Sequence, residues 1–451
     1  MTFRRSPVRE AAGVPRLGPN DIVIDCQRPR LGTSRVTVTI YLPRAVPPGF
    51  ILDLEWHRAQ DHHRVRQVYR PIGSSRMTFS VIMEPGRYYL SVGLFTADWS
   101  RCLIWLDDVQ HLSVPASEAD VGQENWAAAA RTSYQRFLGH YVDRVSDRAW
   151  RIMRPEEGRD TVSEGMAYGM LLALAHNDLR TFHKLWSYAQ SYLNRHELMA
   201  WRIHARGTVM DAGSAADADQ DMAYALIQAG LRWSNPSYLD AGTRMVRAIR
   251  QWETDDGYLR PGDAWAPTPR IFNPSYVCLH YYPVFGRATR DPWWNEWAET
   301  SLGILKNAQH PVSGLWPDWL ALDEGQGGTL PPGFDSTFSY DAVRVPWRLY
   351  LAARAGMARE LNPLGEKMVP FFVARGLNGL CNVYTVSGEP LSSQVSGAFV
   401  AMSALTRYAF TVDSRTQEFL TYVRDWIPES YYDAAIQALV LASVTGSLTF
   451  I

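Results

Sequence analysis

The stretch 113–122 reads SVPASEADVG, and the residue pattern of the chain differs on its two sides. Before it, short runs alternate apolar and polar residues between Pro and Gly. These runs lie at 21–26 (DIVIDC), 35–42 (RVTVTIYL), 76–83 (RMTFSVIM) and 88–95 (YYLSVGLF). Alternation of period two with Val, Ile, Thr and Tyr is typical of antiparallel strands. We therefore predict that residues 1–116 form a β-sandwich domain and that 113–122 connects it to the next.

Beyond Ser117 the apolar residues recur every three or four positions, which indicates helices. About eleven such segments begin near residues 121, 162, 179, 218, 238, 293, 345, 364, 395, 417 and 432. Capping residues precede several of them (Ser163, Asn235 and Asp291), and glycines at 230, 356, 376 and 446 mark several ends. No repeat is detectable, so a solenoid is disfavoured. We predict that residues 117–451 are mainly α and form a closed toroid of paired helices, with a cleft built by the connections at one end.

Composition narrows the classes of function. The 451 residues include 45 Lys and Arg against 46 Asp and Glu, a net charge of -1, which argues against nucleic-acid or anionic-membrane partners. Trp, Tyr and Phe make up 12% of the chain; most of them are expected in the core, and a sugar-binding cleft would also use such rings. No apolar run is long enough to span a membrane, and Met1–Arg9 shows no signal peptide.

The four cysteines form no CxxC motif, so neither a zinc site nor thioredoxin-type chemistry is expected. Cys26 and Cys102 fall in the same predicted domain, where a disulfide and buried free thiols both remain open. We expect no cofactor and no metal.

The first motif that could carry catalytic residues is 160–170, DTVSEGMAYGM. Glu164 lies in the first turn of a predicted helix, where an acid can simply complement the helix dipole. Gly165 and Gly169 each cost helix stability, about 1 kcal/mol relative to Ala. Small residues at this spacing let another group approach the backbone closely, which favours a functional site.

The second motif is 215–224, AADADQDMAY, with three carboxylates in five residues. An EF-hand is excluded because its sixth and twelfth positions would be Met222 and Gln228. Capping by Asp217, with Asp219 in the first turn, is the structural alternative. Crowded acids raise each other's pKa, as a nearby general acid requires.

The third motif is 338–348, FSYDAVRVPWR. Asp341 and Arg344 can pair across one turn for structural reasons alone. Together with Tyr340 they also form a plausible sugar subsite. Further substrate-binding candidates are aromatic residues in connections bounded by Pro or Gly, although each is by itself more typical of a core: Trp201, Tyr276, Trp316 and Trp319.

From about 125 to 446 these motifs, in this order and together with 273–276 (NPSY), resemble glycoside hydrolase family 8. The resemblance implies an (α/α)6 barrel and an inverting mechanism. Glu164 then corresponds to the proton donor and Asp341 to the general base. The pair Asp217 and Asp219 would grip or distort the sugar at the cleaved bond, with Asp217 the stronger candidate. The family usually has Ser or Thr where Ala216 stands, so one hydroxyl near the acid is missing.

The family includes endo-β-1,4-glucanases, xylanases, lichenases and chitosanases. Its chitosanase-like members typically lack the aspartate of the Tyr-Asp-Ala motif, and Asp341 is present. An inverting endo-1,4-β-glucanase (a cellulase) is therefore favoured, acting on a β-linked polysaccharide or oligosaccharide and expected to be secreted or periplasmic. The rival of another class is a non-catalytic glycan-binding or assembly protein, which would lose the acid or the base. A polysaccharide lyase would need a Tyr/His or Arg/His pair, for which His280 is the nearest histidine.

The segment before Ser117 lies outside the resemblance. We expect it to assist glycan engagement or to support the barrel, without catalysing. Its candidates for stacking on sugars are Trp56, Tyr69 and Trp99, each of which is more often a core residue in a sandwich.

Overall fold

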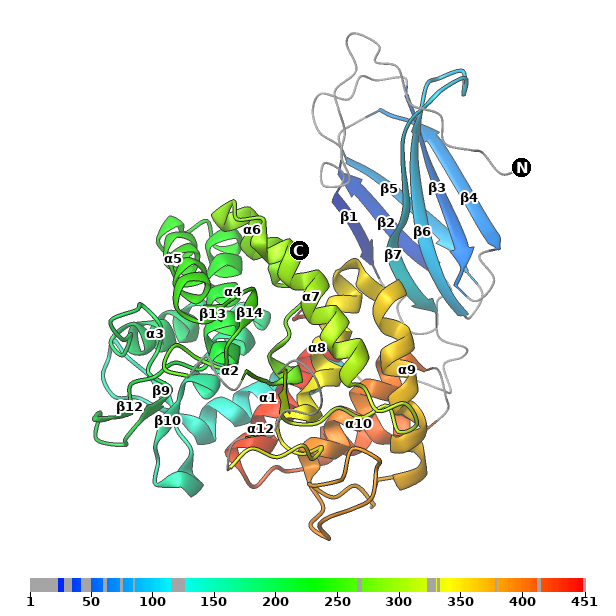
Figure 1. The fold of residues 1–451 in the computed structure, drawn as a ribbon. Helices are drawn as coiled ribbons and strands as arrows, with labels where there is room; N and C mark the ends of the chain where they lie inside the picture. The colour runs from blue at the N-terminus through cyan, green and yellow to red at the C-terminus, as the bar shows by residue number, and fades with distance from the viewer. Residues whose placement is uncertain are drawn as a thin grey trace. The chain divides into compact units, whose positions relative to one another are not determined.

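The structure is a computed structural model, and it divides the chain into two compact units, residues 1–124 (unit 1) and 125–451 (unit 2) (Figure 1). The residues that it describes are 23–27, 35–41, 50–59, 63–73, 76–83, 86–114, 126–265, 270–322, 330, 333–377, 379–411 and 415–448. Most of the predicted connection at 113–122 lies outside these residues, as does the side chain of Cys26.

Unit 1 contains two antiparallel sheets, with strand orders β1-β2-β5 and β4-β3-β6-β7. Their strands are β1 (Val23–Gln27), β2 (Arg35–Tyr41), β3 (Ile51–Arg58), β4 (Arg64–Pro71), β5 (Arg76–Ile82), β6 (Gly86–Phe95) and β7 (Cys102–Val114). The four runs predicted as strands correspond to β1, β2, β5 and β6. Buried apolar side chains of both sheets, such as Val38 and Leu54, belong to one cluster. Trp56 is fully buried in that cluster, so its prediction as a sugar-stacking residue is wrong.

Unit 2 is mainly helical, and its described residues form twelve α-helices. They are α1 (Trp126–Tyr141), α2 (Ser163–Ala175), α3 (Leu179–Gln190), α4 (Ala216–Arg232), α5 (Pro236–Trp252), α6 (Tyr282–Thr289), α7 (Trp293–Ala308), α8 (Val345–Ala352), α9 (Ala358–Arg375), α10 (Gly397–Phe410), α11 (Thr416–Asp425) and α12 (Tyr431–Val444).

The helices of unit 2 alternate between an enclosed and a peripheral position. Helices α2, α4, α10 and α12 are buried on almost every side, and α4 buries three aspartates in this way, whereas α3, α5 and α11 bury one face. Helices α2, α4 and α10 each pack on the peripheral helix that follows them, whereas α12 packs on α1 and also contacts α2 and α10. This mainly helical arrangement is consistent with the expected (α/α)6 barrel (Figure 1).

Three local predictions differ from the structure. The short helix α6 was missed, because Pro283 and Gly286 interrupt its pattern. The helix end expected at Gly230 is wrong: α4 continues to Arg232, and a Cβ at Gly230 would lie 2.7 Å from the backbone nitrogen of Leu239 in α5. Glycine is therefore needed there for close helix packing. The helix expected from about 364 begins six residues earlier.

Among the described residues, no helix has both the length and the apolar character that crossing a membrane would require.

Candidate active site

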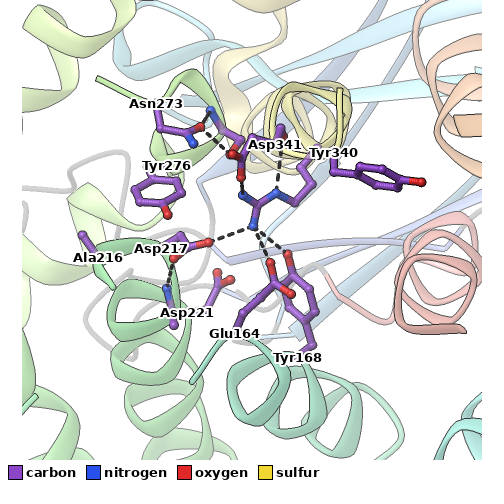
Figure 2. Close-up of polar contacts among 12 residues, drawn as sticks. Glu164, Tyr168, Ala216, Asp217, Asp221, Asn273, Tyr276, Tyr340 and Asp341 are labelled. Atoms are coloured by element: carbon purple, nitrogen blue, oxygen red, sulfur yellow. Dashed lines mark hydrogen bonds and ion pairs between the residues drawn. The ribbon is translucent and has the colours of Figure 1, made fainter. Parts of the chain in front are cut away.

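One guanidinium group joins the acids that the sequence singled out. Arg344 is 1% exposed, and its Nη1 donates to Glu164 Oε2 at 2.9 Å and to Asp217 Oδ2 at 2.8 Å. Its Nη2 donates to Asp341 Oδ1 at 2.6 Å. Figure 2 shows these contacts meeting on a single group, together with a 3.1 Å bond from Nη1 to the Tyr168 hydroxyl. Three carboxylates that lie far apart in the sequence therefore face the same small volume.

Glu164 is the second residue of α2. Strand β10 (Thr161–Val162) leads into the helix, and Ser163 is its first residue, so the expected cap by Ser163 is not formed. The other carboxylate oxygen, Oε1, accepts a 3.2 Å hydrogen bond from the Tyr431 hydroxyl at the start of α12. The group that approaches the glycine at the helix start is this same hydroxyl, because a Cβ on Gly165 would lie 2.9 Å from it.

The environment of Glu164 favours its protonated form. Burial raises its pKa to about 7, and the negative charges of Asp217 and Asp341 add to the rise, against the opposing effect of the Arg344 cation. Burial thus outweighs the helix dipole, which by itself would favour the ionised form. A carboxylic acid tuned to this range can donate a proton near neutral pH.

Asp217 and Asp219 both lie at the start of α4 but face different surroundings. Asp217 Oδ2 contacts Arg344, while its Oδ1 accepts from the backbone nitrogen of Ala218 at 2.9 Å. Asp219 is fully buried, accepts from the backbone nitrogen of Met199 at 3.1 Å, and lies beside the buried side chain of Glu253. Direct substrate binding by Asp219, as predicted, does not fit this burial. Asp217 is the member of the pair that reaches the site.

Asp341 is held by groups on both sides. Its Oδ2 accepts a 3.0 Å hydrogen bond from the indole nitrogen of Trp319, and its Oδ1 accepts from Arg344. Burial raises the pKa of Asp341, while Arg344 opposes the rise. The turn that carries it is fixed by Asp318, whose Oδ1 accepts from the backbone nitrogens of Ser339 (3.0 Å) and Ala342 (2.6 Å).

Aromatic side chains flank the carboxylates. The Arg344 guanidinium carbon lies over the ring of Tyr276, 5.8 Å from the ring centroid. The same ring packs edge-on against Trp319. Trp319 in turn stacks on Trp265 at 6.1 Å. Tyr340 is 40% exposed, and its hydroxyl accepts from the Asn382 amide at 3.1 Å. Half-buried rings beside hydrogen-bonding groups are suited to pyranose rings.

The two remaining residues predicted to bind substrate differ in their exposure. Trp201 is half-buried beside the start of α2, where its carbonyl accepts from the backbone nitrogen of Ser163. Trp316 is fully buried and donates its indole N–H to the Leu305 carbonyl at 2.8 Å. Its prediction as a substrate-binding residue is therefore wrong, because it is a core residue with a satisfied polar group.

Several residues at the site were not predicted from the sequence. Tyr431 contacts Glu164 from 267 positions away, and no local pattern marks it. Tyr168 lies one turn after Glu164 within the same motif, so helical spacing could have identified it. Trp265 and Asp318 belong to connections, which carry no periodic signal.

Two nearby groups have other roles. Asp221 is 1% exposed and forms a bidentate pair with Arg348 at 2.6 and 2.8 Å, so its charge is compensated away from Arg344. His280 is buried against Tyr224 and Tyr281, and it makes none of the contacts that join the carboxylates. The pair that a lyase would need is not among the groups that meet at Arg344.

The similarity of this chain to known proteins agrees with the arrangement of carboxylates around Arg344. Residues 116–446 match the family model described as glycosyl hydrolases family 8. The chain belongs to this family. The family resemblance inferred from the four motifs is confirmed.

Proteins named for two different activities are similar to this chain. Endoglucanase A of Acetivibrio thermocellus is 30% identical over 302 residues, covering 64% of this chain and 62% of that protein. The reducing-end xylose-releasing exo-oligoxylanase Rex8A of Paenibacillus barcinonensis is 26% identical over 334 residues, covering 65% and 83%. The chain thus spans less than two-thirds of the length of the first of these relatives.

A solved structure shares the fold. The apo β-1,3-1,4-glucanase from Paenibacillus sp. X4 superposes with a TM-score of 0.67 at 22% identity, over 72% of this chain and 94% of that one. At this identity the likeness establishes the architecture of the family 8 unit and leaves its substrate to other arguments.

Proposed function

We propose that this family 8 chain is an inverting endo-acting glycoside hydrolase that cleaves β-1,4-glucan, with Glu164 as general acid and Asp341 as general base. The observation that carries the proposal is the single Arg344 guanidinium that joins Glu164, Asp341 and Asp217. A non-catalytic glycan-binding protein has no need to keep an acid of raised pKa beside a second carboxylate.

The chemistry follows from the two environments. Glu164, protonated near neutral pH, gives its proton to the leaving glycosidic oxygen. Asp341, whose carboxylate accepts hydrogen bonds from Arg344 and the Trp319 indole N–H, accepts a proton from water that attacks the opposite face of the sugar. Inversion needs about 6.5–9.5 Å between the two carboxyl groups to admit that water.

Asp217 contacts the same nitrogen of Arg344 as the proposed acid Glu164. We propose that it grips the sugar at the cleaved bond, because its Oδ2 faces the same guanidinium as the two catalytic carboxylates. Tyr276, Trp319 and Tyr340 would bind pyranose rings in the adjacent subsites, with Trp201 on the side of α2. Ala216 is buried and offers no hydroxyl there.

The choice of β-1,4-glucan rests on two arguments. Asp341 occupies the Tyr-Asp-Ala position, and Endoglucanase A is a relative by sequence. Xylan and mixed-linkage glucan stay as alternatives because Rex8A is also a relative and a β-1,3-1,4-glucanase shares the fold. Such polymers are met outside the cytoplasm, so we propose that the protein works there. We further propose that the two sheets of unit 1 form a β-sandwich domain spanning about residues 1–116.

The test is a panel of soluble carboxymethyl cellulose, mixed-linkage glucan, xylan and chitosan, with new reducing ends measured over time. The proposal predicts the fastest initial rate on the β-1,4-glucan, together with a rapid fall in viscosity that marks internal cleavage. A preference for xylan or chitosan would reassign the substrate. Absence of new reducing ends on every polymer would reject the hydrolase.

A further inference from the structure

One face of the sheet β4-β3-β6-β7 carries a group of aromatic side chains, here called the aromatic patch: Tyr69, Phe95, Trp99 and Trp105. Strand register places them together. Tyr69 pairs with Asp53, Asp53 with Gly93, and Gly93 with Trp105. Directly paired residues of antiparallel strands point to the same face. The neighbouring residues Leu52 and Leu54 belong to the buried cluster, so the aromatic patch lies on the opposite face from the core.

The patch exposes much of its ring area. Tyr69 is 56% exposed, Trp105 40% and Trp99 39%. Gly93 permits the arrangement, because a Cβ there would lie 2.5 Å from a ring atom of Phe95 and 2.7 Å from one of Trp105. The two rings therefore lie directly over the strand. Large exposed aromatics grouped on one face mark a binding surface more than a random surface composition does.

Trp99 is presented by a strained hairpin between β6 and β7. Its φ of 60° is in the left-handed region, which is unusual for a bulky residue. The Asp98 carboxylate fixes the turn by accepting from Thr96 Oγ1 at 2.6 Å and from the backbone nitrogen and Oγ of Ser100 at 3.1 and 2.7 Å. The indole then lies edge-on to Tyr69, with centroids 5.0 Å apart. Strain that is held in place in this way is typical of functional positions.

We propose that the aromatic patch is a second glycan-binding site, which holds a single β-glucan chain on unit 1. Pyranose rings offer apolar C–H faces to exposed aromatic rings and hydroxyl groups to nearby polar atoms. Exposed polar side chains are at hand: Gln67, which donates through Nε2 to the buried Asp53 at 2.9 Å, and Ser100 next to Trp99. The choice of glycan rests on the function proposed for unit 2.

The ring geometry selects a form of the polymer. The planes of Tyr69 and Trp99 are 89° apart, and those of Phe95 and Trp105 are 71° apart. Rings at such angles cannot lie together on one flat crystal face. A separate chain can turn from one ring to the next, so we expect binding to soluble β-glucan and little binding to microcrystalline cellulose.

The test is affinity electrophoresis of the full chain in native gels containing hydroxyethyl cellulose, with Glu164→Gln in every sample to prevent hydrolysis. Trp99→Gly and Tyr69→Ala should each weaken retardation about tenfold, the effect of losing a stacking partner. Trp99→Gly removes the ring and also relieves the left-handed strain, so its thermal unfolding temperature should not fall. The matched control is Trp252→Ala in unit 2, which removes a tryptophan that is 37% exposed and should leave retardation unchanged.

The outcomes separate this proposal from the function of unit 2. With Glu164 intact, Trp99→Gly should cleave short soluble oligosaccharides at the wild-type rate while losing efficiency on long polymers. Undiminished retardation of both patch variants would overturn the second site, whatever the hydrolytic activity. A change in oligomeric state on gel filtration, with glucan binding unaltered, would instead identify the patch as a contact between proteins and overturn the proposal as well.

Discussion

At the scale of single residues, the balance of charge around Arg344 determines how the site works. Arg344 supplies one positive charge to three carboxylates, so the cluster would carry excess negative charge if all three were ionised. A proton kept by Glu164 relieves this excess, which agrees with the pKa of about 7. The same arrangement that stabilises the cluster thus prepares Glu164 to act as an acid.

The roles of Glu164 and Asp341 predict the effect of isosteric variants. Glu164→Gln and Asp341→Asn should each lower kcat by about 10²–10⁴-fold, because general acid or base assistance contributes that much. Both variants should remain folded by circular dichroism. Asp240→Asn, at an exposed acid of unit 2, is the control and should leave the rate unchanged. Activity within tenfold of wild type in either variant would reject its assignment.

The raised pKa of Glu164 predicts the alkaline side of the pH profile. The acid must be protonated to work, so kcat/KM should fall as pH rises through about 7. Initial rates on a soluble β-glucan across a pH series measure this directly. An activity that stays constant well above that pH would show that another group donates the proton.

Arg344 predicts a second residue-scale result. Lysine keeps the positive charge but lacks the planar fork that contacts Glu164, Asp217 and Asp341 at once. Arg344→Lys should therefore lower kcat at least tenfold while the change in KM stays smaller. A variant that keeps wild-type kcat would mean that charge alone, without the fork, is enough.

At the scale of elements, the start of α4 depends on a buried pair of acids. Asp219 and Glu253 are both fully buried, and Ser214 Oγ donates to Glu253. Burial raises the pKa of Asp219 to about 8 and that of Glu253 well above its usual value, so the folded pair holds a proton that the unfolded chain releases. We interpret the pair as an anchor for the helix that carries Asp217.

This linkage predicts how stability varies with pH. Raised pKa values mean that the pair's contribution is fully present below about pH 4 and is lost as pH rises through about 8. Glu253→Gln supplies an amide donor that needs no proton. Its free energy of unfolding, measured with denaturant, should therefore fall less between about pH 6 and pH 9 than that of the wild type. Glu418→Gln, at an exposed acid of α11, is the control. Equal slopes for Glu253→Gln and wild type would contradict the shared proton.

The helices and their caps were the features that the sequence predicted best. Asn235 caps α5 as predicted: it precedes Pro236, and its side chain accepts a hydrogen bond from the backbone nitrogen of Ser237. Such features can be predicted because caps and periodic apolar residues depend on the local sequence. Trp316 and Trp56 were misassigned because a tryptophan in a core and one in a cleft have the same local pattern. Their burial depends on which elements pack together, and a single sequence does not specify that.

At the scale of the whole molecule, the site exists only through the fold. Glu164 lies in the first turn of α2, Asp217 in the first turn of α4, and Asp341 precedes α8; Figure 2 shows these three facing one volume. Tyr431, the first residue of α12, reaches the same volume through its hydrogen bond to Glu164. The motifs and the family resemblance predicted the three carboxylates. The partners that tune them, Tyr431 and Asp318, come from tertiary packing that has no sequence pattern of its own.

The central claim is that Glu164 and Asp341 act from opposite sides of the glycosidic bond, and the configuration of the first product tests it most directly. Proton NMR of the wild-type protein with a short β-1,4-linked oligosaccharide records the anomeric signals before mutarotation equalises them. A base that activates water predicts the α-anomer as the first new signal, with the β-anomer growing later. An initial β-anomer would show a retaining enzyme with a covalent intermediate, and would contradict the assignment of Asp341 as base.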